Sequence, residues 1–168
     1  MPVSTSLPVR AFGLGVVTGL RSQLPLALLA RTPAARRASR AEHLLRSPAG
    51  RRLTGLVAGG EIAVDKLPST PPRVRPPVLA TRLALGGLSA ALLAQGGVRE
   101  RVPAVALGTA GAALGTAVGY TARTRLPART GLPDAVWAVV EDGLAYGVGR
   151  RLVRQRRPWP LRLIPGLR

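Results

Sequence analysis

Long apolar stretches alternate with clusters of arginine along the chain, and this alternation predicts transmembrane helices joined by basic loops. The clearest stretch, Val102 to Ala122, holds 21 residues without a charge, which is long enough to cross a hydrocarbon core of about 30 Å as a helix. The sequence therefore predicts an all-α, polytopic transmembrane bundle of about five helices in a single domain over residues 1–154. The expected helices are 9–30, 53–67, 78–98, 102–122 and 134–150.

The stretch 9–30 carries polar residues and a proline in its second half. Arg21, Ser22 and Gln23 precede Pro25, and proline inside a helix removes one backbone hydrogen bond and favours a kink or a break. At membrane depth this combination indicates a discontinuous helix whose freed backbone groups face protein or water. The alternative is a helix end that lies near the membrane interface.

Two basic segments are expected on the membrane surface. Thr32 and Pro33 have the pattern of a helix N-cap followed by proline at the first helical position. The helix expected over 33–46 places alanine and leucine on one side and arginine and His43 on the other, which is typical of an interfacial amphipathic helix. The tail 155–168 is also expected at the headgroups, since each basic residue near anionic lipid contributes about 1 kcal/mol.

The net charge of +18 raises the alternative of a nucleic-acid binder, and Lys66 is the only lysine among 25 basic residues. Such a protein would spread arginine along solvated faces and offer aromatic side chains for stacking. Here aromatic residues make up 3% of the chain, the mean hydropathy is +0.20, and the charges are segregated. The expected partners are therefore the lipid bilayer and anionic lipid headgroups, with no nucleic acid.

Glycines recur at four-residue spacing in several of the expected helices. Small residues at this spacing let helix backbones approach closely, so they predict tight helix packing and make a homodimer a candidate assembly. The alternative is an Ala/Gly-rich helix with no special partner. The glycines expected to serve packing are Gly15, Gly19, Gly111, Gly115, Gly119, Gly143 and Gly147.

Two segments, one in each half of the chain, have similar sequences. The segment LGVVTGL (14–20) matches LGTAVGY (114–120) at leucine and two glycines. Because the first and fourth expected helices are three apart in order, they would cross the membrane in opposite directions. This is the pattern of an inverted-topology repeat, which recurs in secondary transporters. A chance match between glycine-rich helices is the alternative.

Apart from Asp134 at the start of the second, the two short helices 53–67 and 134–150 hold four of the seven acidic residues: Glu61, Asp65, Glu141 and Asp142. Each carboxylate near a membrane helix centre costs about 2.5–3.5 kcal/mol on the insertion scale, so these side chains need partners. In one hypothesis, Glu61, Glu141 and Asp142 pair with arginines and only hold the bundle together. In a second they line a polar site, and in a third they lie at the interface, which suits Asp65 best.

We take the second hypothesis forward as a transporter or channel-like protein with a buried site for a cation, a proton or a small charged solute. Its alternative is a non-transporting scaffold or lipid-interacting protein. The candidate site is Arg21, Glu61, Glu141 and Asp142, with Asp65, Lys66, Arg82, Arg123 and Tyr146 in support.

Enzymatic chemistry has no recognisable basis in the sequence. Cysteine is absent and His43 is the only histidine, so neither a thiol nucleophile nor a zinc cluster can be assembled. The glycines of 13–19 have the wrong spacing for a dinucleotide loop. No catalytic residue, metal site or cofactor is therefore expected.

Three motifs resemble a family of small bacterial membrane proteins catalogued only as domain of unknown function 4126. They are GLRSQLP (19–25), the E-x-x-x-D-K-x-P pattern (61–68) and the pair Glu141-Asp142. The likeness covers roughly residues 11 to 152, and the family's polar positions fall on Arg21, Pro25, Glu61, Asp65, Lys66, Pro68, Glu141 and Asp142. The resemblance implies a multi-pass membrane fold and no established activity.

The distribution of basic residues predicts an orientation in the bacterial inner membrane. With five helices, the loop after the first helix, the loop after the third and the C-terminus share one side and carry most of the arginines. The positive-inside rule then predicts a cytoplasmic C-terminus and an external N-terminus. A re-entrant first segment would invert that assignment.

Overall fold

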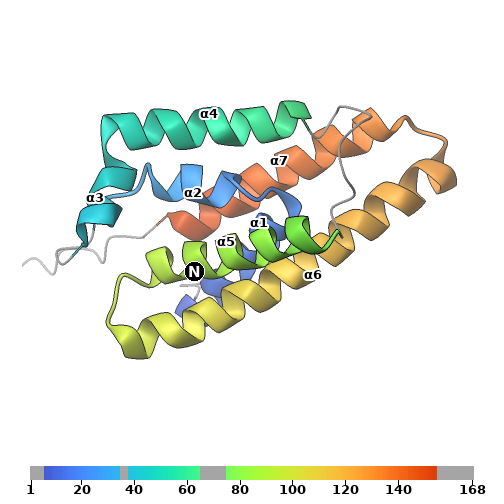
Figure 1. The fold of residues 1–168 in the computed structure, drawn as a ribbon. Coiled ribbons are helices and arrows are strands. Elements are labelled where there is room, and N and C mark those ends of the chain that lie inside the picture. The colour runs from blue at the N-terminus through green and yellow to red at the C-terminus, as the bar shows by residue number, and fades with distance from the viewer. Residues whose placement is uncertain (1–5, 35–37, 65–74, 155–168) are drawn as a thin grey trace, which may run out of the picture.

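The computed structural model describes residues 6–34, 38–64 and 75–154, and within them the protein is all-helical. The described chain forms seven helices instead of the expected five with one interfacial helix (Figure 1). Three of them, α1 (Leu7–Leu20), α5 (Pro76–Ala94) and α6 (Val98–Thr130), pack against one another and form the centre of the bundle. The remaining four are α2 (Leu24–Leu29), α3 (Arg40–Arg46), α4 (Pro48–Val64) and α7 (Asp134–Val153).

The expected helix 9–30 is two helices that form a hairpin. The chain leaves α1 at Leu20, is extended at Arg21 (φ −138°, ψ 102°), and starts α2 at Leu24. Figure 1 shows α2 running back along the bundle after this turn. Leu28 of α2 and Val17 of α1 lie beside the same residue of α7, since a Cβ added at Gly149 would lie 2.7 Å and 3.4 Å from their side chains. The discontinuous form of the first segment is therefore the one present, and it reverses the chain.

The expected interfacial helix 33–46 is shorter, because its N-cap is Ser39 and not Thr32. Ser39 and Glu42 form a capping box, with the Ser39 Oγ accepting from the Glu42 N–H at 3.2 Å, so the helix is fixed to begin at Arg40. On the side expected to be apolar, Leu45 is partly buried but Ala41 is exposed, while Glu42 and Arg46 are buried. His43 is exposed, as a residue of a solvated face should be.

Three expected spans are longer than their apolar cores, because charged residues join the helix ends. The helix expected over 53–67 begins at Pro48, which suits proline because the first turn needs no backbone donor, and its end beyond Val64 lies outside the described residues. The helix expected over 102–122 extends to Val98–Thr130, about 50 Å at 1.5 Å per residue. The helix expected over 134–150 extends to Asp134–Val153. The helix expected over 78–98 is instead shorter and spans Pro76–Ala94.

Glycines set the close approach of α1 and α6. A Cβ added at Gly115 would lie 2.9 Å from the carbonyl carbon of Val16, and one at Gly15 would lie 2.8 Å from that of Gly108. Real Cβ atoms do not come this close, so only glycine allows the two backbones to touch. Gly19, Gly111 and Gly119 are buried along the same two helices.

The contacts between α1 and α6 also fix their relative direction. Gly111 faces Phe12, and Gly115 faces Val16, one turn later in both helices. The two helices therefore run parallel, as Figure 1 shows. The expectation that the segments 14–20 and 114–120 cross in opposite directions is wrong, because the hairpin at Arg21 adds a reversal that the count of apolar stretches did not include.

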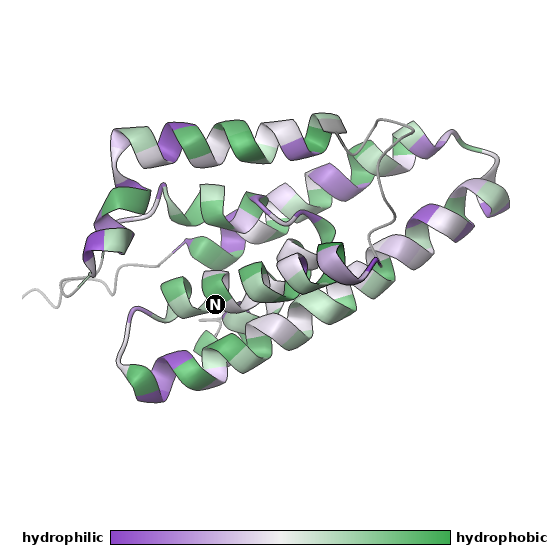
Figure 2. Ribbon diagram, in the orientation of Figure 1, coloured by the Kyte–Doolittle hydropathy of each residue, from purple (hydrophilic) through white to green (hydrophobic). Residues whose placement is uncertain are grey.

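Large hydrophobic side chains are exposed on several helices, while many small residues and a few charged ones are buried. Large hydrophobic side chains such as Leu56, Leu114 and Leu144 are exposed on α4, α6 and α7, and apolar residues colour much of these helices in Figure 2. Two helices, Pro76–Ala94 and Val98–Thr130, are long and apolar enough to cross a membrane. Gly143 and Gly147, expected in packing, face open space on α7.

Candidate functional site: the charged centre at the hairpin turn

Charged side chains of α4, α5 and α7 contact the turn between α1 and α2, and a further arginine of α6 pairs with α7. We call these residues the charged centre: Arg21, Glu61, Arg82, Arg123, Glu141 and Asp142. They come from the hairpin turn and from helices α4, α5, α6 and α7. All are buried or partly buried, and Arg21 is only 1% exposed.

Arg82 of α5 caps the end of α1. The last carbonyls of a helix have no partner within it, and here the Arg82 guanidinium donates to the Gly19 carbonyl at 2.6 Å and to the Leu20 carbonyl at 3.3 Å. Thr116 of α6 adds a hydroxyl donor to the Gly19 carbonyl at 3.4 Å. A positive side chain at a helix C-terminus also favours the helix dipole, so Arg82 is held by the backbone of the hairpin.

Glu61 of α4 binds the other side of the same turn. Its carboxylate accepts from the Ser22 and Gln23 backbone N–H groups at 2.8 Å each, and from the Ser22 hydroxyl. Its Oε1 also lies 3.5 Å from the Arg82 guanidinium. Both carboxylate oxygens are engaged, so Glu61 fixes the turn from a position 39 residues away in the chain.

Asp142 and Glu141 of α7 pair with two different arginines. Asp142 forms an ion pair with the buried Arg21 at the hairpin turn. Glu141 lies 3.5 Å from Arg123 of α6, and Arg123 also forms a bidentate pair with Asp134 at 2.6 and 2.7 Å. Glu61 and Glu141 are thus each held by their own arginine.

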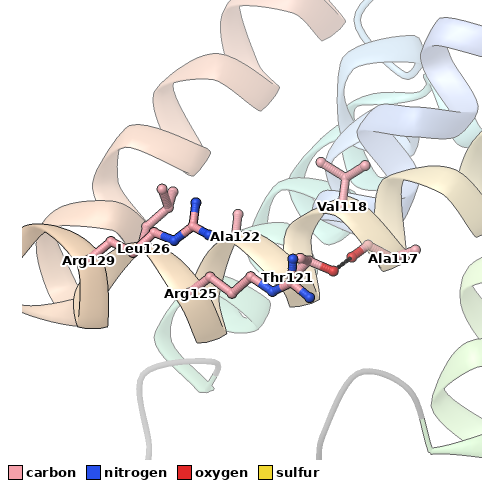
Figure 3. A pocket seen from close by; sticks show the side chains of 7 residues that line it. All are labelled: Ala117, Val118, Thr121, Ala122, Arg125, Leu126 and Arg129. Carbon is pink, nitrogen blue, oxygen red and sulfur yellow. Dashed lines mark hydrogen bonds between the residues drawn. The ribbon is translucent and has the colours of Figure 1, made fainter.

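The remaining predicted residues lie apart from the charged centre. Tyr146 is exposed on α7, and Asp65 and Lys66 lie outside the described residues. An open hollow runs along α6 and is lined by residues of that helix, with Arg125 and Arg129 on its wall (Figure 3). No member of the charged centre lines this hollow.

Sequence reasoning missed three partners in and around the centre. Ser22 and Gln23 stood out as polar residues beside a proline, but nothing in their spacing shows that their N–H groups bind a distant carboxylate. Asp134 was placed at a helix start, where an acidic residue suits the dipole, and its bidentate pair with Arg123 could have been suspected only from the short turn joining α6 to α7.

A second ionic cluster joins α3 to the start of α6. Arg101 lies 3.0 Å from the Glu42 carboxylate, and the Arg46 guanidinium donates to the Glu42 carbonyl at 3.3 Å. Burial lowers the pKa of Arg46, and the neighbouring Glu42 opposes that shift. This cluster ties the basic segment around α3 to the bundle.

Comparisons with protein-family models, with curated proteins and with solved structures found no match to this chain.

Proposed function

We propose that this chain is a multi-pass protein of the bacterial inner membrane and that its charged centre handles a small charged solute. The membrane part of the proposal is supported by the two long apolar helices and by the large hydrophobic side chains exposed around the bundle. In water such an exposed apolar surface is unfavourable, whereas lipid tails cover it at no cost. The buried glycines and ion pairs suit the same environment, where polar groups must be satisfied within the protein.

The hairpin changes the proposed orientation at the N-terminus. Because α1 and α2 together return to the side from which they start, only α4, α5, α6 and α7 cross. Residues 6 and 154, the two ends of the described chain, then lie on one side. That side carries Arg10, Arg99 and Arg101, seven arginines between residues 31 and 52, and seven more after residue 149. The positive-inside rule places it in the cytoplasm, so the external N-terminus expected above is replaced by a cytoplasmic one, while the C-terminus stays cytoplasmic.

The observation that carries the functional proposal is the helix break at the charged centre. Interrupted helices expose backbone donors and acceptors at membrane depth, and transporters use such breaks to bind solutes. Buried ionisable groups in a membrane protein are functional candidates for the same reason. Here the two most deeply buried members of the centre are arginines, Arg21 and Arg82.

The deep burial of Arg21 and Arg82 favours an anionic solute over a cation or a proton. Glu61, Glu141 and Asp142 each already face an arginine, so a cation would compete with a guanidinium for each carboxylate. An anion would instead meet buried arginines and backbone N–H groups. We therefore narrow the proposed solute from any small charged species to a small anion.

A non-transporting scaffold is the second candidate, and the ion pairs themselves favour it. Breaking a buried pair by removing one partner costs about 3–5 kcal/mol, so the same contacts would hold a hairpin in place without any solute. In this alternative the basic surfaces around α3 bind anionic headgroups. The resemblance to domain of unknown function 4126 stays a prediction, and it suits both candidates.

Flux measurements on reconstituted protein separate the two candidates. We expect liposomes with wild-type protein to take up small labelled carboxylates faster than empty liposomes. The variant Glu61→Gln should remain folded and should change this rate of uptake. Glu42→Gln serves as the matched control, because Glu42 lies outside the charged centre and pairs with Arg101 in the second ionic cluster. If wild-type liposomes show no flux of any charged solute and both variants only lose stability, the scaffold function is correct.

A further inference from the structure

The donors around Glu61 form a site that can also bind the carboxylate group of a separate molecule. The Ser22 N–H and hydroxyl and the Gln23 N–H converge on one carboxylate group, with the Arg82 guanidinium beside it. They come from the hairpin turn and from a buried side chain of α5. Arg82 is itself fixed by the Gly19 and Leu20 carbonyls, so this donor is preorganised without Glu61.

The two engaged oxygens define the shape of the ligand. Oε1 accepts from Ser22 and faces Arg82, while Oε2 accepts from Gln23. A planar group with two oxygens on one carbon satisfies all of these donors together, and a spherical ion such as chloride does not. The geometry therefore selects a carboxylate.

The helix that carries Glu61 is the most weakly held of the long helices. α4 packs chiefly against the short helices α2 and α3, and Leu53, Leu56 and Val57 on it are exposed. Gly59 and Gly60, next to Glu61, have open space where side chains would be. Glu61 itself is 13% exposed, and the helix that carries it packs little against α1, α5 or α6.

We propose that the hairpin turn is a binding site for the carboxylate group of a small solute, and that Glu61 is an internal ligand that closes the site until such a solute displaces it. The proposal names the solute class and the gating residue for the transport proposed above, and in that sense it rests on it. α4 then acts as a lid that closes when Glu61 binds and opens when a solute carboxylate takes its place. In the wild-type protein Glu61 competes at the high effective concentration of a tethered group.

Chemical rescue of Glu61→Ala tests the site directly, because the substitution removes the atoms that one acetate ion would replace. The variant is purified in a neutral detergent, and its unfolding temperature is measured against acetate concentration, with sodium chloride keeping the ionic strength constant. We expect acetate at about tenfold its dissociation constant to raise the unfolding temperature by about 3 °C. Wild-type protein should not respond, because Glu61 fills the site.

Two further variants make the test specific. Glu141→Ala also removes a carboxylate from a buried arginine, but its Arg123 retains Asp134, so acetate should not stabilise it. Adding Ser22→Ala to Glu61→Ala removes one hydroxyl donor. The acetate concentration needed for half-maximal stabilisation should then rise about fivefold. Equal rescue of both alanine variants, or rescue by chloride as strong as by acetate, would overturn the proposal.

The stability measurement can fail independently of the flux measurement. Rescue without any wild-type flux leaves the carboxylate site intact and refutes transport, whereas flux without rescue refutes Glu61 as the internal ligand. If Glu61→Ala gives no folded protein in chloride, the yield of monodisperse protein extracted in acetate becomes the readout. A higher yield in acetate supports the site, and an equal yield in both salts overturns it.

Discussion

The contribution of Glu61 to stability should come mainly from the hairpin backbone and not from its ion pair with Arg82. Hydrogen bonds to a charged group contribute about 1.5–3 kcal/mol each, and Glu61 accepts two from backbone N–H groups at 2.8 Å. Since Glu61 is partly exposed, the lower end applies, and we expect Glu61→Ala to lower the free energy of unfolding by about 3 kcal/mol. The Arg82 guanidinium lies at 3.5 Å, beyond the 2.7–2.9 Å of a charge-assisted hydrogen bond.

A double-mutant cycle separates the contribution of the hydrogen bonds between Glu61 and the turn from that of its ion pair with Arg82. Arg82→Gln should be costly in its own right, because it removes the donor to the Gly19 and Leu20 carbonyls. The coupling energy between Glu61→Ala and Arg82→Gln should nevertheless be only about 1 kcal/mol, since the direct contact is long. The free energies come from reversible unfolding in mixed micelles with added denaturing detergent, followed by the fluorescence of Trp137 on α7. A coupling energy above about 3 kcal/mol would show that the ion pair, and not the turn, is what Glu61 serves.

Two further predictions use matched substitutions and the same unfolding assay. Gly115→Leu should destabilise by at least about 3 kcal/mol, because its side chain would meet the Val16 backbone. Gly147→Leu should be within about 1 kcal/mol of wild type, since that glycine faces open space, and a large cost there would point to a partner on α7. Asp142→Asn should cost about 3 kcal/mol, because it removes a carboxylate that pairs with the buried Arg21. Asp134→Asn should cost under about 1 kcal/mol because Asp134 is largely exposed, and equal costs would contradict the assignment of Arg21–Asp142 as the buried pair.

The sequence predicted the helical class and the break at Arg21–Pro25, because both depend on local chemistry. Apolar length marks helices, and a polar cluster before proline marks an interruption. The reversal at that break was not predictable in the same way. It depends on Glu61 and Arg82 reaching the turn from distant helices, and no local pattern records such a contact.

The charged centre was predictable in its members but not in its pairing. Glu61, Glu141 and Asp142 were expected to need partners, and Arg82 and Arg123 were among the supporting residues. Which acid meets which arginine depends on how the helices pack around the hairpin, and this follows from contacts such as Gly15 against Gly108 and Gly149 against Leu28. The start of α3 is a different case, since the Ser39-x-x-Glu42 capping box was legible in the sequence.

The most direct test of the account is to determine on which side of the membrane residues 6 and 154 lie, because the proposed hairpin topology puts both on the same side. The chain has no cysteine, so single-cysteine variants Ser6→Cys, Gly131→Cys and Arg154→Cys can each be labelled with a membrane-impermeant maleimide. In intact spheroplasts we expect labelling at residue 131 and protection at residues 6 and 154, and in inverted vesicles the reverse. Labelling of residue 6 from outside would show that the first segment crosses the membrane and would contradict the hairpin, and labelling of all three from both sides would contradict membrane insertion.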